Sequence, residues 1–190
     1  MLDFLRTPTR QVASRSVTDV APIPLARPRL AEAAALLFSG LLAGSFLYGG
    51  VNVLHAFRSV PLDMRLTFHT ELMSANGVVM QALMAFTFIC GLALTVRARG
   101  IERLLAGIAT GLSVAVFLIT RLGNVPINQE IKVWAVTGPP SGYDEILTRW
   151  EHFHLARVAC AVLVFGLLVA ATAAGSRPRA VISSGEVRVR

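Results

Sequence analysis

The hydrophobic residues of this chain are grouped in long runs, each about as long as a whole helix, and do not follow the period of a single helical turn. Four runs contain no Asp, Glu, Lys, Arg or His, and they cover residues 33–54, 77–96, 104–120 and 158–175. Each run is close to the roughly 17–25 residues with which a helix crosses the core of a bilayer. The runs are apolar around their whole circumference, whereas a helix of a soluble bundle keeps a polar face. The pattern predicts an all-α, integral membrane four-helix bundle.

The segments outside these runs predict the domain organisation. Residues 1–29 are basic and proline-containing without the apolar stretch of a signal peptide, so we expect a disordered cytoplasmic arm. Residues 176–190 form a second basic tail. Between these two segments, residues 30–175 are expected to form the transmembrane domain.

A long polar segment precedes the fourth apolar run. Its glycines and prolines, Gly123 and Pro126 among them, are expected to interrupt helix and to form a structured outer loop between spans three and four. Acidic residues just after position 142 are typical of a helix N-terminus. We therefore expect the fourth helix to cover residues 142–175 and to begin outside the hydrocarbon.

Charge predicts the orientation. Of the 18 Lys and Arg residues, two thirds lie in the terminal segments and in the turn at 97–103, whereas the 11 acidic residues are divided almost evenly. The positive-inside rule then places both termini in the cytoplasm of a cell-membrane protein. The basic residues flank helices and carry no recognition motif, so we expect them to meet anionic lipid head groups and predict no nucleic-acid partner.

Small and polar residues inside the runs give weaker signals. The pairs Gly40/Gly44 and Gly107/Gly111 have the spacing that lets helices approach closely. We give equal weight to glycines that pack between helices and to glycines that face the lipid. Asn76 and Gln81 are interpreted as internal hydrogen-bonding groups in preference to substrate contacts.

The candidate chemistry is concentrated in RWEHFHLAR, residues 149–157, on the side predicted to face away from the cytoplasm. On a helix, Trp150, His154 and Arg157 share one face, and Glu151 lies within reach of His154. Arg157 borders the fourth apolar run, where an unpaired charge costs at least ~2–3 kcal/mol. We therefore expect Arg157 to have a partner, either a carboxylate such as Glu71 or Glu151, or an anionic ligand.

Two alternative interpretations remain open for this stretch. Arg149, Trp150 and His152 can serve as interfacial anchors. A metal or haem site would draw its ligands from His55, His69, Glu151 and His154, because Glu-x-x-His is a spacing used in di-iron helical bundles. A single such pair is a weak signal, and we predict no metal and no cofactor.

Two motifs together resemble a known family. GNVPINQEI supplies Asn124, Pro126 and Asn128, and RWEHFHLAR supplies Arg149, Trp150, Glu151, His154 and Arg157. Pro61, followed by Phe68 and His69, precedes the second run. These elements resemble the anthrone oxygenase-like family of four-span membrane proteins, also called DUF1772, and the resemblance covers roughly residues 35–175.

The resemblance implies an activity. Some members of that family oxidise anthrones to anthraquinones, so it implies a hydrophobic aromatic substrate and a cofactor-independent oxygenase. His154 would be the base, since imidazole changes protonation near neutral pH. Arg157, with Asn124 or Asn128, would stabilise the enolate oxygen. Glu151 completes the candidate catalytic group, and Trp150 and His69 would contact the substrate.

Two other functions remain as alternatives to the oxygenase. One is a non-catalytic membrane scaffold or small-solute carrier, in which the motifs tie the outer segment to the bundle. The other is the histidine-based metal or haem protein. The sequence does not predict the oligomeric state.

Overall fold

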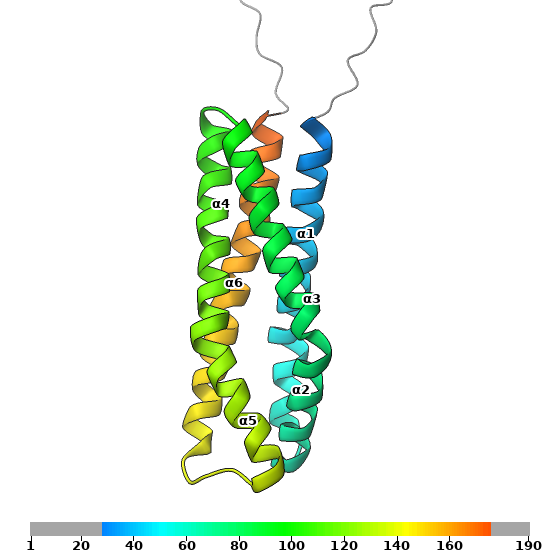
Figure 1. The fold of residues 1–190 in the computed structure, drawn as a ribbon, viewed down its shortest axis with the longest axis vertical. Coiled ribbons are helices and arrows are strands. Elements are labelled where there is room, and N and C mark those ends of the chain that lie inside the picture. Colours follow the sequence, from blue (N-terminus) through cyan, green and yellow to red (C-terminus); the bar gives the residue numbers. More distant parts are fainter. Residues whose placement is uncertain (1–27, 176–190) are drawn as a thin grey trace, which may run out of the picture.

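The structure is a computed structural model that describes residues 28–175, and this part of the chain contains helices but no strand (Figure 1). In chain order the elements are α1 (Pro28–Tyr48), the π-helical η1 (Gly49–Val53), α2 (Leu54–Ser59), α3 (Leu62–Arg97), α4 (Ile101–Leu118), the π-helical η2 (Ile119–Asn124), α5 (Val125–Thr137) and α6 (Tyr143–Gly175).

These elements join into four long helices. Two of them are continuous through a π-helical segment, over Leu30–Ser59 and Ile101–Thr137, and the others are α3 and α6. Each is long and apolar enough to cross a membrane. At ~1.5 Å per residue, a helix of this length exceeds the ~30 Å bilayer core, so its polar end extends beyond the hydrocarbon. The predicted all-α four-helix membrane bundle is confirmed.

The helices extend beyond the apolar runs that predict them. Helix α3 begins at Leu62, although the run that marks it begins at residue 77. The expected interruption at Gly123 and Pro126 is wrong. Gly123 lies within η2, and Pro126 is the second residue of α5, so one continuous helix runs through both positions. Between the third and fourth long helices, the chain leaves the helical path only between Thr137 and Tyr143.

Both ends of the described chain lie at one end of the bundle, with the α3–α4 turn (Figure 1). Helices α2 and α5 and the start of α6 form the other end, and all four histidines belong to that half. Which end faces the cytoplasm stays a prediction. The expected basic arm and tail lie outside the described residues, apart from residues 28 and 29 at the start of α1.

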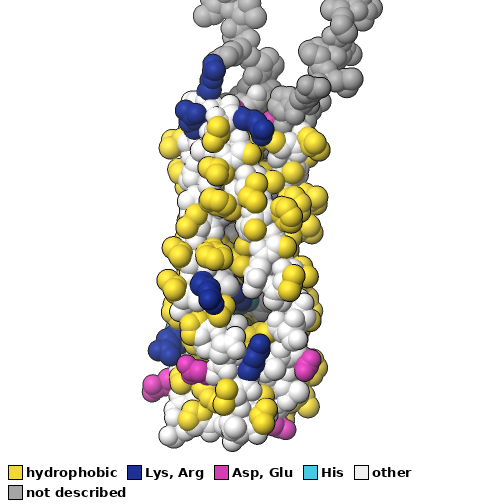
Figure 2. All heavy atoms as spheres, in the orientation of Figure 1, with side chains coloured by type: hydrophobic (Ala, Val, Ile, Leu, Met, Phe, Trp, Pro, Cys, Tyr) yellow, Lys and Arg dark blue, Asp and Glu magenta, His cyan; other side chains and the backbone are white. Residues whose placement is uncertain are grey.

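The interior and the surface both fit a lipid environment. Alanines pack between α1, α4 and α6 near the end with the termini, whereas larger side chains such as Phe57, Trp134 and Trp150 fill the opposite end. Hydrophobic side chains are spread along the whole face shown in Figure 2, whereas charged side chains lie at the upper end and in the lower part.

The glycine pairs divide between packing and open space. A Cβ on Gly40 would lie 3.3 Å from the Phe165 ring, and one on Gly107 would lie 3.6 Å from Thr95. A Cβ on Gly44 or Gly111 would meet nothing within 4 Å. Close helix approach therefore uses one glycine of each pair.

Candidate active site

A cavity of about 690 Å³ lies inside the half of the bundle that holds the histidines. It is lined by residues of α1, η1, α2, α3, η2, α5 and α6, and a hollow is visible in the lower half of the face in Figure 2. Most of the lining is apolar, from residues such as Leu72, Met73, Met80 and Met84. Its polar lining includes His69, Asn128, His154 and Arg157.

His154 is held in one orientation by its neighbours on α6. The ring is 5% exposed and stacks on Trp150, with centroids 5.3 Å apart and planes at 10°. Arg157 donates to its Nδ1 from Nε at 3.2 Å and from Nη2 at 2.7 Å. Because arginine is only a donor, Nδ1 must be unprotonated, and a neutral His154 then carries its proton on Nε2.

The other edge of the His154 ring faces a glycine of η1. Its Nε2 is buried and makes no hydrogen bond of normal geometry with a described residue, although the ring interacts with the backbone of Phe46. A Cβ on Gly49 would lie 3.0 Å from both Nε2 and Cε1, so only glycine leaves this edge uncrowded. An unsatisfied donor of this kind is costly in an apolar interior and is typical of a site that awaits a ligand.

Arg157 has no carboxylate partner among the described residues. Besides His154, its guanidinium contacts the Phe46 ring, 4.6 Å from the centroid. The expectation that Glu71 or Glu151 pairs with it is therefore wrong. The positive charge beside the cavity is not neutralised by the described part of the protein, which leaves an anionic ligand as the remaining expected partner.

His69 is the second buried imidazole of the cavity. It is 1% exposed, stacks on Phe57 at a centroid distance of 5.1 Å, and meets Trp150 edge-on at 4.4 Å. Neither of its ring nitrogens makes a hydrogen bond of normal geometry with a described residue, although the ring interacts with the side chain of Asn128. Trp150 thus separates two histidines, and the face expected to stack on a substrate is covered by His154.

The two asparagines of the GNVPIN segment act on Trp150. Asn124 is fully buried, and its Nδ2 donates to the Trp150 carbonyl at 3.1 Å. Asn128 accepts from the Trp150 indole N–H at 2.6 Å. Of the two, only Asn128 lines the cavity. The structure therefore places Asn128, but not Asn124, where a substrate contact is feasible.

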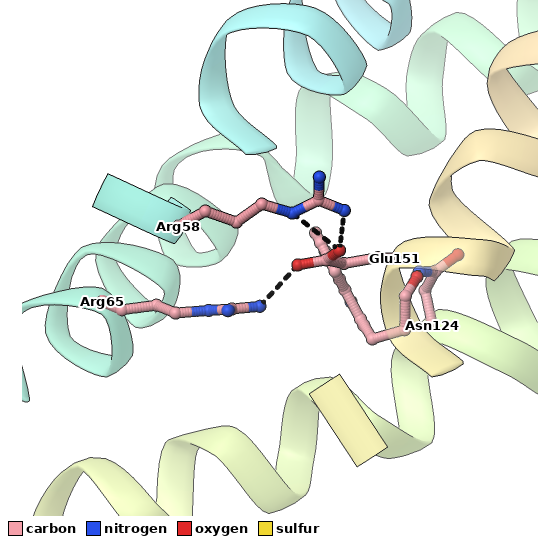
Figure 3. Close-up of polar contacts among 5 residues, drawn as sticks. Arg58, Arg65, Asn124 and Glu151 are labelled. Carbon is pink, nitrogen blue, oxygen red and sulfur yellow. Dashed lines mark hydrogen bonds and ion pairs between the residues drawn. The ribbon is translucent and has the colours of Figure 1, made fainter. Parts of the chain in front are cut away.

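Glu151 belongs to a different cluster. Its carboxylate accepts from Arg58 of α2 and from Arg65 of α3, the latter at 3.0 Å, and both side chains converge on it in Figure 3. Glu151 does not line the cavity. The geometry gives it the role of tying α2 and α3 to α6 and does not bring it to His154 and Arg157 as a third catalytic group.

The alternative metal site is not assembled. No group of three or more His, Cys, Asp or Glu within residues 28–175 is placed to hold a metal ion. His55 is exposed on α2, and Glu151 is engaged by the two arginines, so the set His55, His69, Glu151 and His154 does not converge.

Several residues of the site carried no sequence signal. The contacts of Arg58 and Arg65 with Glu151, of Phe46 with Arg157 and of Gly49 with His154 all join different helices. A helical period reports on one face of one helix, so it cannot predict contacts of this kind.

The fold and the site define a class of protein, a four-span membrane protein with a lateral apolar cavity that holds two histidines and an arginine. The model of the family described as anthrone oxygenase matches residues 64–167, more than half of the chain. The chain belongs to this anthrone oxygenase-like family, as its motifs predict. No curated protein and no solved structure matches it.

Proposed function

We propose that this protein is a membrane oxygenase that converts anthrone-type aromatic ketones to the corresponding quinones inside the cavity. It would lie in the cell membrane with cytoplasmic termini, so that the histidine-bearing half is on the opposite side. The observation that carries the proposal is one apolar cavity lined by two buried histidines and by an arginine that has no carboxylate partner among the described residues. Family membership supports the same chemistry.

The reaction requires little chemistry from the protein. An anthrone has an acidic methylene carbon, and the charge of its carbanion is shared with the ketone oxygen. After a base takes the proton, the carbanion passes electrons to dioxygen and forms a C–O bond, and loss of water leaves a second ketone. In balance, CH₂ and O₂ give C=O and H₂O. The ring carbon is oxidised, and dioxygen is reduced.

The protein then has to supply a base, a donor for the enolate oxygen and a site from which bulk water is excluded. The hydrogen bonds from Arg157 make Nε2 of His154 a donor, so we assign His154 to the enolate oxygen and Arg157 to the positioning of its ring. His69, whose ring nitrogens receive no hydrogen bond from an arginine, is the group that can accept the carbon-bound proton. This assignment moves the base from His154, the candidate favoured by the sequence, to His69.

Purified protein in lipid nanodiscs tests the proposal. With anthrone as substrate, we expect oxygen uptake and quinone formation in equal amounts, at a rate well above that of empty nanodiscs, which measure autoxidation. His154→Ala should lower the catalysed rate by ~10²–10³ because an oxyanion donor is lost. His152→Ala is the matched control, since His152 is exposed two residues away on α6. If wild-type protein does not exceed empty nanodiscs, the proposed function is refuted.

A further inference from the structure

The cavity opens through the side of the bundle. Among the residues that line it, the exposed ones all come from α1 and α3: Leu41, Gly44, Ser45, Tyr48, Asn76 and Gln81. The lining residues of α5 and α6, such as Asn128 and His154, are buried or half-buried. The six exposed residues therefore form a mouth between α1 and α3.

The mouth lies at a level where the neighbouring surface is apolar. Leu37 and Leu47 on α1, and Val78 and Val79 on α3, are exposed beside it. On the side toward the chain termini, the rings of Phe38 and Phe86 stack across the two helices, 4.8 Å apart. The opening is thus bordered by apolar surface, and it lies on the side of the bundle and not at its end.

Polar side chains on this rim have no partner within the described protein. Asn76 and Gln81 are exposed and make no hydrogen bond with another described residue, so their interpretation as internal groups is wrong. The same holds for Ser45 and Tyr48 across the mouth. Polar groups that face lipid without a partner are unfavourable and mark functional positions in membrane proteins.

We propose that the mouth is the entry for the substrate, a flat aromatic ketone that arrives dissolved in the bilayer, and that Asn76 and Gln81 select it through its hydroxyl and ketone groups. This inference rests on the proposed function, because that function defines the occupant. The lipid-facing opening admits an apolar ring system, and the amides on the rim form hydrogen bonds with molecules that carry polar substituents.

Two glycines provide the means to narrow the mouth. A Cβ on Gly44 of α1 or on Gly77 of α3 would meet nothing within 4 Å, so a larger side chain there fits without backbone strain. Gly111 on α4 and Gly166 on α6 are equally open, and neither lines the cavity. Replacing glycine by leucine raises helix propensity by the same amount at each of the four positions. The pair Gly111 and Gly166 is therefore a matched control for the pair Gly44 and Gly77.

Trp150 reports occupancy of the cavity without turnover. The chain has two tryptophans, and Trp134→Phe leaves Trp150, which lines the cavity, as the only one. Proteoliposomes of this variant are mixed with liposomes that carry 9,10-anthraquinone, an electron acceptor that quenches indole emission. We expect saturable quenching. Gly44→Leu and Gly77→Leu should slow it by at least ~10-fold, whereas Gly111→Leu and Gly166→Leu should leave its rate unchanged.

A second measurement concerns selection. Asn76→Leu and Gln81→Leu should each weaken quenching by a hydroxylated anthraquinone by ~2–10-fold, the value of one hydrogen bond, and should not weaken quenching by the unsubstituted quinone. Lateral entry is refuted if Trp150 emission is quenched as fast in Gly44→Leu and Gly77→Leu as in the controls. It is also refuted if all four glycine variants slow the quenching equally. Saturable quenching in a protein that consumes no oxygen would refute the oxygenase alone.

Discussion

The division of roles between the two histidines is open to a direct test with glutamine. In His154→Gln, the amide oxygen can accept from Arg157 as Nδ1 does, and the amide N–H₂ can donate near the position of Nε2. Glutamine cannot take a proton from carbon. A donor at position 154 therefore survives this substitution, whereas a base at position 69 does not survive His69→Gln.

The magnitudes follow from these roles. Loss of a general base typically costs ~10²–10⁴ in rate, so His69→Gln should approach the uncatalysed oxidation. His154→Ala removes an oxyanion donor and should cost ~10²–10³. His154→Gln should remain within ~10-fold of wild type, because the tight site beside Gly49, where a Cβ would lie 3.0 Å from the ring, accommodates the narrower amide.

The assay is initial oxygen uptake in nanodiscs at saturating anthrone, with the autoxidation of empty nanodiscs subtracted and each variant shown to be folded by its elution profile. The reasoning is refuted if His154→Gln is as inactive as His154→Ala while His69→Gln keeps wild-type activity. His154 would then be the base, and Arg157 would have to release its Nδ1 before the reaction.

Two further predictions concern stability, measured by thermal unfolding in detergent. Glu151→Ala leaves Arg65, whose side chain is 12% exposed, without its carboxylate and should cost about 3 kcal/mol, whereas Arg58→Ala should cost far less because the Arg58 side chain is 62% exposed. Equal losses in the two variants would contradict the structural role of Glu151. Gly123→Ala places a Cβ 2.6 Å from the Phe153 ring and should lower the unfolding temperature, and an unchanged temperature would contradict this contact.

The sequence predicts the membrane part of the fold well because lipid imposes a strong pattern. A run without charges can lie only in hydrocarbon or in a protein core, so the four runs identify four helices. Outside the lipid this constraint is lost. Residues 62–76 mix polar and apolar positions, and Pro126 is compatible either with a helix break or with a first helical turn. The extensions of α3 and α5 that help to build the site are therefore poorly predicted, whereas α6 begins within one residue of its predicted start.

The candidate site is predictable only as far as one helix reaches. Trp150, His154 and Arg157 lie seven residues or fewer apart on α6, and their shared face follows from the helical period. The contact of His69 with Trp150 depends on how α3 packs against α6. The same packing places Asn76 on the rim of the cavity and not in the interior of the bundle. The spacing of residues along the chain does not predict how two helices pack.

The partners of the charged groups explain why an anion would form readily in this cavity. A carboxylate beside Arg157 would neutralise it and would repel an enolate. The nearest acid on the same helix, Glu151, lies about 9 Å away along the axis and is already shared by two arginines. That cluster keeps a net positive charge, and Arg157 adds another, while its described polar partner is a neutral imidazole. In a low-dielectric surrounding both charges favour the developing enolate, and the donor through which Arg157 acts is His154.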